Sequence, residues 1–99
     1  WIEADLDVFV PRQKFHLVVI SRFFDRVRLP QVVEMGLAPG GWLIAETYHE
    51  QSASLPGARV TNPEYLVQRG EWRRLFPFVD TVVEEEDERM SRFVGRRKL

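Results

Sequence analysis

The run 37–46 constrains the fold of this chain more than any other stretch, because a helical pattern gives way there to a strand pattern. Apolar residues recur at helical spacing over 29–37. The group Pro39-Gly40-Gly41 breaks that pattern, and an apolar strand over 42–48 follows at once. An apolar, β-branched run over 15–20 precedes the helix. Strand, helix and strand at this spacing predict a βαβ unit with parallel strands and a right-handed crossover.

Both strand patterns are almost wholly apolar, which is typical of parallel strands in an α/β sheet that are covered on both faces. In such a sheet ligands bind outside the carboxyl ends of the strands. The strand over 42–48 carries polar side chains at that end, so we expect the ligand-binding edge of the sheet there. His16 lies inside the first strand, and we expect it to be a structural histidine with a backbone or carboxylate partner.

The second half of the chain predicts a loop, two short helices and a hairpin. The segment 49–61 is rich in Ser, Pro and Gly and has little periodicity, so we expect a surface loop. Asn62-Pro63-Glu64 has the cap, proline and acid that begin a helix. A further apolar helical face follows, with members Trp72, Leu75 and Phe76. Strand-like patterns over 78–84 and 90–94 then flank the acidic run 84–88 and predict an antiparallel hairpin, with that run pairing with the basic last strand.

Composition excludes several classes of function. The 99 residues suffice for one domain, and a net charge of −1 gives no bulk attraction to nucleic acid or to an anionic membrane. There is no cysteine for a disulfide or a zinc-thiolate site, which fits a cytoplasmic location. No apolar run is long enough to span a membrane, and no Gly-x-Gly occurs. Because the chain begins with Trp1 and its first residues resemble the end of a strand, we expect part of a longer protein.

These segments, in this order, resemble the second half of class I methyltransferases that use S-adenosylmethionine (SAM). The stretch 59–76 resembles a segment of tellurite-resistance-type methyltransferases, with an Asn-Pro start followed by a Gly-Glu pair. Here Arg69-Gly70-Glu71-Trp72 stands where the family has Pro-Gly-Glu-Leu, and Phe15-His16 stands where it has Phe-Asp. Glu46-Thr47 also matches the family, and Ala4-Asp5-Leu6 is similar to the acidic loop after its third strand.

The resemblance implies a partial Rossmann-like methyltransferase sheet with parallel central strands, flanking helices and a C-terminal antiparallel hairpin. It covers residues 1–99 as one domain, the C-terminal portion of a methyltransferase domain without the glycine-rich SAM loop. The resemblance also implies which residues contact SAM. Asp5 and the Leu6 backbone would hold the adenine, whereas Ser21, Arg22 and Phe23 would flank the methionine end. The alternatives are a solvated acid at Asp5, a surface charge at Arg22 and core positions for Phe23 and Phe24.

The acceptor is expected at the same edge of the sheet, against Glu46, Tyr48 and His49. Glu46 closes an apolar strand and therefore requires a partner that offsets its desolvation. His49 would act as a base or would be a solvated loop histidine. We assign no catalytic residue and no metal ligand.

The implied function is SAM-dependent methyl transfer to a small molecule by the parent protein, with the isolated chain inactive. The alternative is a non-catalytic α/β module that associates through an exposed sheet edge, as a homodimer for example, because the strand over 15–20 would then lie at an edge. Arg96-Arg97-Lys98 is the one basic run that could contact nucleic acid, but the acids of 84–88 compensate its charge, so no nucleic-acid or membrane partner is expected.

Overall fold

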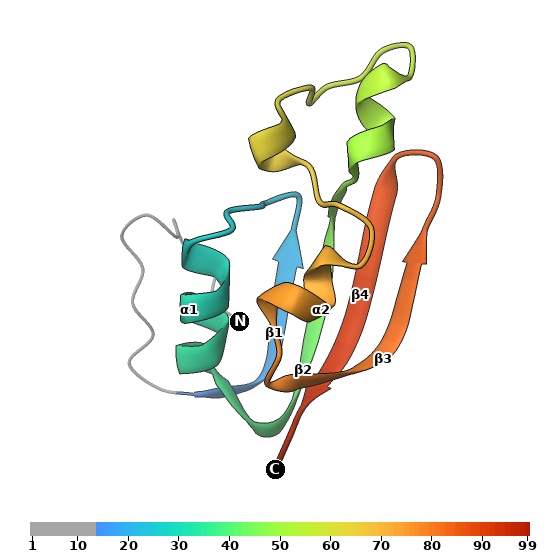
Figure 1. The fold of residues 1–99 in the computed structure, drawn as a ribbon. Helices are drawn as coiled ribbons and strands as arrows, with labels where there is room; N and C mark the ends of the chain where they lie inside the picture. The colour runs from blue at the N-terminus through green and yellow to red at the C-terminus, as the bar shows by residue number, and fades with distance from the viewer. Residues whose placement is uncertain (1–13) are drawn as a thin grey trace.

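The computed structural model of this chain describes residues 14–99, which form a four-stranded sheet in the order β1-β2-β4-β3. Figure 1 shows the sheet with its helices, coloured along the chain. The elements in chain order are β1 (Phe15–Ser21), α1 (Arg28–Gly36), β2 (Leu37–Tyr48), the 3₁₀ helices η1 (Glu50–Ser54) and η2 (Pro63–Tyr65), α2 (Glu71–Leu75), β3 (Val79–Glu86) and β4 (Met90–Arg97).

The strand pairing confirms the fold class predicted from the sequence. Strands β1 and β2 are parallel neighbours with α1 between them in the chain, and Ser21 at the end of β1 lies opposite Glu46 of β2. Strand β4 pairs antiparallel with β2 on one side and with β3 on the other. The βαβ unit and the terminal hairpin therefore share one mixed sheet.

The Pro-Gly-Gly group lies inside β2 rather than before it. Helix α1 ends at Gly36, and β2 begins at Leu37, which was expected to be helical. The pairing partner of Phe15 is Leu37 and that of Leu17 is Trp42, so 38–41 form a bulge against β1. A Cβ atom on Gly41 would lie 2.8 Å from the carbonyl oxygen of Ala38, which explains why glycine is required in this bulge.

One face of the sheet carries the hydrophobic core. Helices α1 and α2 lie over this face (Figure 1), and their buried residues pack against Leu43 and Ala45 of β2. Trp72 of α2 is fully buried, and its ring lies 5.6–6.3 Å, between centroids, from three phenylalanine rings. Its indole N–H donates to the hydroxyl of Ser91 at 3.0 Å, so the polar atom of this large side chain is satisfied inside the core.

The opposite face is open over the described part of the chain, which corrects the expectation that both strands are covered on both faces. Leu17 is 52% exposed, and Val19, Trp42 and Ile44 are 39–40% exposed. Two features explain the difference: β1 is an edge strand, and no described helix packs on this face. His16 is also exposed and does not have the structural role expected of it.

The predicted charge pairing across the hairpin holds only in part. Asp87 pairs with Arg92 of β4 at 2.9 Å, and Asp80 of β3 lies 3.9 Å from Lys98 just beyond β4. Two acids of the run 84–88 instead pair with arginines in and just before α2: Glu84 with Arg73 and Glu86 with Arg69. Strand β3 extends to Glu86, so these two acids belong to the strand and not to the turn.

No helix within residues 14–99 is both long and apolar enough to cross a bilayer.

Candidate ligand site at the carboxyl edge of the sheet

A cavity of about 340 Å³ lies where β1 and β2 end, at the edge of the sheet that was predicted to bind ligands. Its lining comes from the loop between β1 and α1, from the end of β2 and from the segment around η2. The lining residues are Arg22, Phe23, Phe24, Asp25, Thr47, Tyr48, Val60 and Tyr65.

The loop between β1 and α1 is fixed at both of its ends. Asp25 caps α1, because one carboxylate oxygen accepts the backbone N–H groups of Val27 and Arg28, each at 2.9 Å. Phe24 is buried in the core, and Phe23 packs against it while half-buried. The two aromatic residues that were expected to be core residues therefore also form a wall of the cavity.

Arg22 has a left-handed backbone conformation, with a φ of 57°. Its N–H donates to the carbonyl oxygen of Glu46 at 2.7 Å, so the end of β2 holds the first residue after β1 in this conformation. The Arg22 side chain is exposed and lines the cavity.

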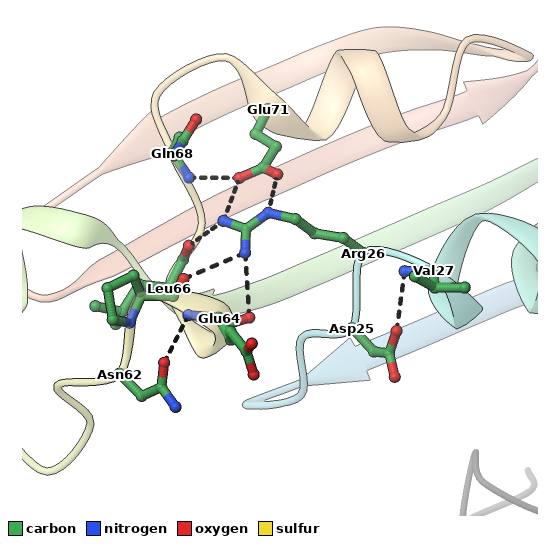
Figure 2. A network of polar contacts seen from close by, with 9 residues as sticks. Asp25, Arg26, Val27, Asn62, Glu64, Leu66, Gln68 and Glu71 are labelled. Atoms are coloured by element: carbon green, nitrogen blue, oxygen red, sulfur yellow. Dashed lines mark hydrogen bonds and ion pairs between the residues drawn. The ribbon is translucent and has the colours of Figure 1, made fainter.

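Figure 2 shows that Arg26 joins two segments that lie far apart in the sequence. Its guanidinium forms a two-point ion pair with the carboxylate of Glu71, whose side chain is only 8% exposed. It also donates to three backbone carbonyls near η2, those of Pro63, Glu64 and Leu66, at 2.8–3.2 Å. Because Glu71 also accepts the N–H of Gln68 at 2.8 Å, every charged oxygen in this network has a partner.

This network holds the two walls of the cavity together. The loop 22–25 is adjacent to Arg26, and Tyr65 is adjacent to the carbonyls that Arg26 binds. Asn62 caps η2 by accepting the N–H of Glu64 at 3.0 Å, which confirms the predicted helix start, although the helix is a single 3₁₀ turn. The position of Tyr65 in the cavity wall thus depends on an arginine 39 residues earlier in the chain.

Of the three residues expected to contact an acceptor, Tyr48 lines the cavity. Glu46 has the partner that was expected of it: its carboxylate accepts from Arg92 Nε at 2.7 Å. Glu46 is not one of the residues that line the cavity.

His49 is a buried structural residue, which corrects the expectation of a solvated loop histidine. It is 3% exposed, and its Nε2–H donates to the carbonyl oxygen of Asp87 at 2.7 Å. Its own carbonyl accepts the hydroxyl of Ser52 at 2.7 Å. The bond to Asp87 ties the end of β2 to the hairpin turn, and the bond from Ser52 ties it to η1. His49 does not line the cavity.

Asp87 organises the hairpin turn through three donors. Its carboxylate accepts the N–H groups of Met90 and Arg89 at 2.8 Å and a guanidinium N–H of Arg92 at 2.9 Å. The backbone N–H of Met90, followed by these other donors, lowers the pKa of Asp87 to about 2. The same pairing with Asp87, and then with Glu46, raises the pKa of Arg92.

The structure thus brings Arg22, Phe23 and Tyr48 together among the predicted site residues. Ser21 ends β1 beside them without lining the cavity, whereas Asp5 and Leu6 lie outside the described residues. Sequence reasoning missed five lining residues: Phe24, Asp25, Thr47, Val60 and Tyr65. The position of Asp25 just before a helical pattern was the one available signal, because it is typical of an N-cap. Among residues 14–99, no three His, Asp or Glu side chains are grouped so that they could hold a metal ion.

No protein-family model matches the chain, and no curated protein has a similar sequence. Two solved structures have a similar fold. The N-methyltransferase NodS from Bradyrhizobium japonicum WM9 is similar over 100% of this chain and 60% of its own, with a TM-score of 0.67 and 18% identity. TehB from Haemophilus influenzae is similar over 96% of this chain and 40% of its own, with a TM-score of 0.70 and 12% identity. The chain therefore spans less than two thirds of the length of each, and its fold is similar to part of the fold of these two proteins.

Proposed function

We propose that this chain is the C-terminal portion of a SAM-dependent methyltransferase that acts on a small molecule. The observation that carries the proposal is the cavity at the carboxyl ends of β1 and β2, in a chain whose fold is part of the methyltransferase fold. Ligands of open α/β sheets bind at this edge, outside the carboxyl ends of the strands. The cavity also has the mixture of aromatic and polar lining residues that is typical of small-molecule sites.

The residues of the cavity fit the reacting ends of a donor and an acceptor. Its volume of about 340 Å³ lies near the lower limit of the range for ligand pockets, roughly 300–1,000 Å³, so it has room for the reacting groups but not for two whole molecules. Four aromatic side chains, those of Phe23, Phe24, Tyr48 and Tyr65, line it. Aromatic rings attract cations such as a sulfonium, so Phe23 and its neighbours would hold the methionine end of SAM.

The protein's own contribution is alignment and exclusion of water. SAM supplies the methyl group in an already activated form. Holding two reactants in line can remove about 7–11 kcal/mol of a barrier, and the Arg26–Glu71 network holds the cavity walls for that purpose. The Nε2–H of His49 donates to the carbonyl of Asp87, so His49 has no role as a base in this reaction. A soft nucleophile on the acceptor requires none.

The 99 residues alone are expected to bind SAM weakly or not at all, because they contain no Gly-x-Gly loop to approach the nucleoside. Calorimetry with SAM tests this on two polypeptides: the chain itself and the parent protein that continues upstream. The parent is expected to bind, and Asp5→Ala is expected to weaken its binding by about 1–3 kcal/mol if Asp5 holds the adenine amine. Micromolar binding by the 99 residues would mean that the donor site is misplaced here, and no binding by the parent would overturn the proposal.

A second candidate, a non-catalytic module that associates through its sheet edge, is favoured by a different observation. Strand β1 is at the edge of the sheet, and its outward residues Leu17 and Val19 are exposed. An exposed apolar edge strand is a template for pairing with another chain, such as a second copy of this one.

A further inference from the structure

We propose that the Arg22 guanidinium binds an anionic group, a carboxylate or a phosphate, of the methyl acceptor, and that the acceptor is a small acid with a flat apolar body. The proposal rests on the function proposed above and adds to it the chemical class of the acceptor. Three observations carry it: the backbone of Arg22, the absence of a protein partner for its side chain, and the aromatic lining around it.

Arg22 occupies a backbone position that suits glycine. Among residues 14–99 it is the one non-glycine residue with a positive φ, 57°. The N–H···O bond of 2.7 Å to Glu46 maintains this conformation from the end of β2. Residues held in unfavourable backbone conformations cluster at ligand sites, where the surrounding structure over-determines them. A long cationic side chain at such a position indicates that the side chain itself has a use.

The guanidinium of Arg22 makes no ion pair or hydrogen bond within the described part of the chain. Seven arginines of this part are engaged with carboxylates or backbone carbonyls: Arg26, Arg69, Arg73, Arg89, Arg92, Arg96 and Arg97. Arg59 and Arg74 are exposed and, like Arg22, have no such bond here, but neither lines the cavity. Asp25 is the other charged residue that lines the cavity, and one of its oxygens already accepts the two N–H groups that begin α1. The backbone carbonyl of Glu46 accepts the N–H of Arg22, but its carboxylate accepts from Arg92 and not from the Arg22 guanidinium. The fork of five donors on Arg22 is therefore available to a ligand, and its geometry matches a carboxylate or a phosphate.

The remaining lining residues define the body of the ligand. Phe23 is left to the methyl donor, while Tyr48 and Tyr65 supply flat apolar surface for the acceptor. Neither tyrosine hydroxyl has a hydrogen-bond partner in residues 14–99. Aromatic surface with a polar tip suits a planar molecule that carries a polar substituent. An anionic group on Arg22 and a flat ring against these side chains can be accommodated together in about 340 Å³.

Titration of the chain with simple probes tests the proposal by the backbone amide NMR signals of the cavity residues. Benzoate and phenyl phosphate are expected to shift the signals of Arg22, Phe23 and Tyr48, with at least ten times the affinity of neutral benzamide. L-Methionine carries the same carboxylate on the amino-acid end of the donor, and it is expected to show no binding that depends on Arg22. Stronger Arg22-dependent binding of L-methionine than of benzoate would assign the anion to the donor and overturn the proposal.

Two variants of Arg22 separate binding from folding. Arg22→Gln is expected to lose at least tenfold in benzoate affinity while its weak benzamide binding is unchanged. Arg22→Gly is expected to lose benzoate binding equally and to raise the melting temperature by several degrees, because glycine relieves the left-handed strain. Arg74→Gln is the matched control: Arg74 is exposed on α2, does not line the cavity, and its loss is expected to leave benzoate binding unchanged.

Equal binding of benzoate and benzamide, or full benzoate affinity in Arg22→Gln, would overturn the proposal. The titration contains no SAM, so its result is independent of methyl transfer. If benzoate binds through Arg22 and the parent does not bind SAM, the anion site stands and the methyltransferase proposal falls. If the parent binds SAM and benzoate does not use Arg22, only the present inference falls.

Discussion

The two faces of the sheet are built from similar residues but differ in what covers them. On one face, Leu43 and Ala45 are fully buried beneath α1 and α2. On the other, Trp42 and Ile44 alternate with them along the same strand and are 39–40% exposed. Apolar character is therefore a property of both faces, whereas burial depends on which elements lie above each one. The comparison assigns stability to the covered face and predicts that changes on the open face affect stability little.

The largest expected effect is on the covered face. Trp72→Ala removes the side chain around which three phenylalanine rings pack, and it leaves the hydroxyl of Ser91 without its donor. We expect a loss of about 3–5 kcal/mol in the free energy of unfolding, measured by urea denaturation. Trp42→Ala makes the same chemical change on the open face and is expected to cost less than about 1 kcal/mol. Equal losses for the two variants would break the comparison.

The ion pairs Arg26–Glu71 and Arg73–Glu84 also differ in burial, and we expect them to differ in their contribution to stability. Arg26→Ala leaves a nearly buried carboxylate without its cation, and it is expected to cost about 3 kcal/mol. Arg73→Ala removes a partner that is 64% exposed and is expected to cost at most about 1 kcal/mol. Thermal unfolding of both variants checks the difference. A cost for Arg73→Ala as large as that for Arg26→Ala would contradict the structural role given to the buried pair.

Substitutions on the open face and at the β1 edge are expected to change self-association rather than the free energy of unfolding. We expect the chain to associate at micromolar concentration in sedimentation experiments. Val19→Lys places a charge on the exposed edge strand and should weaken that association at least tenfold, because edge lysines oppose strand pairing. Glu85→Lys is a control on β3, at the other edge of the sheet. A monomeric chain that binds no hydrophobic dye would argue against a second copy on β1.

The smallest expected effect is the acid dependence of the hairpin turn. Folding lowers the pKa of Asp87 from 3.8 to about 2, so its contribution to stability is present above pH 4 and is lost as the pH falls toward 2. Asp87→Asn keeps an acceptor oxygen for the turn but cannot titrate. The difference in urea midpoint between the two proteins should therefore shrink between pH 5 and pH 2. A difference that stays constant over this range would rule out Asp87 as the source.

The sequence predicts the parallel pair of the βαβ unit and the terminal hairpin because periodicity and turn residues are local signals. The pairing of β4 with β2, which joins the two into one sheet, has no such signal and was not predicted. The run 15–20, the helix after it and the strand over 42–48 were recognisable for this reason. Burial was predicted less well: a wholly apolar strand is expected to be covered on both faces, and no residue in β1 indicates that one face is open.

The location of the site at the carboxyl ends of β1 and β2 was predictable, but most of the side chains that line it were not. Tyr48 and Arg22 could be placed because Tyr48 is the last residue of β2 and Arg22 directly follows β1. The bond between Arg26 and Glu71 joins residues 45 positions apart, and no local pattern indicates it. The left-handed conformation of Arg22 also has no sequence signal, because arginine is not a residue that such positions favour.

The central claim is that the methyl donor binds on the cavity side of the sheet edge, and nuclear Overhauser effects from the SAM methyl protons test it most directly. In the parent protein bound to SAM, we expect contacts from that methyl group to ring protons of Phe23 and Tyr48, which line the cavity. No contact is expected to Trp42, which lies on the open face. Contacts to Trp42, or their absence from both cavity residues, would contradict the account.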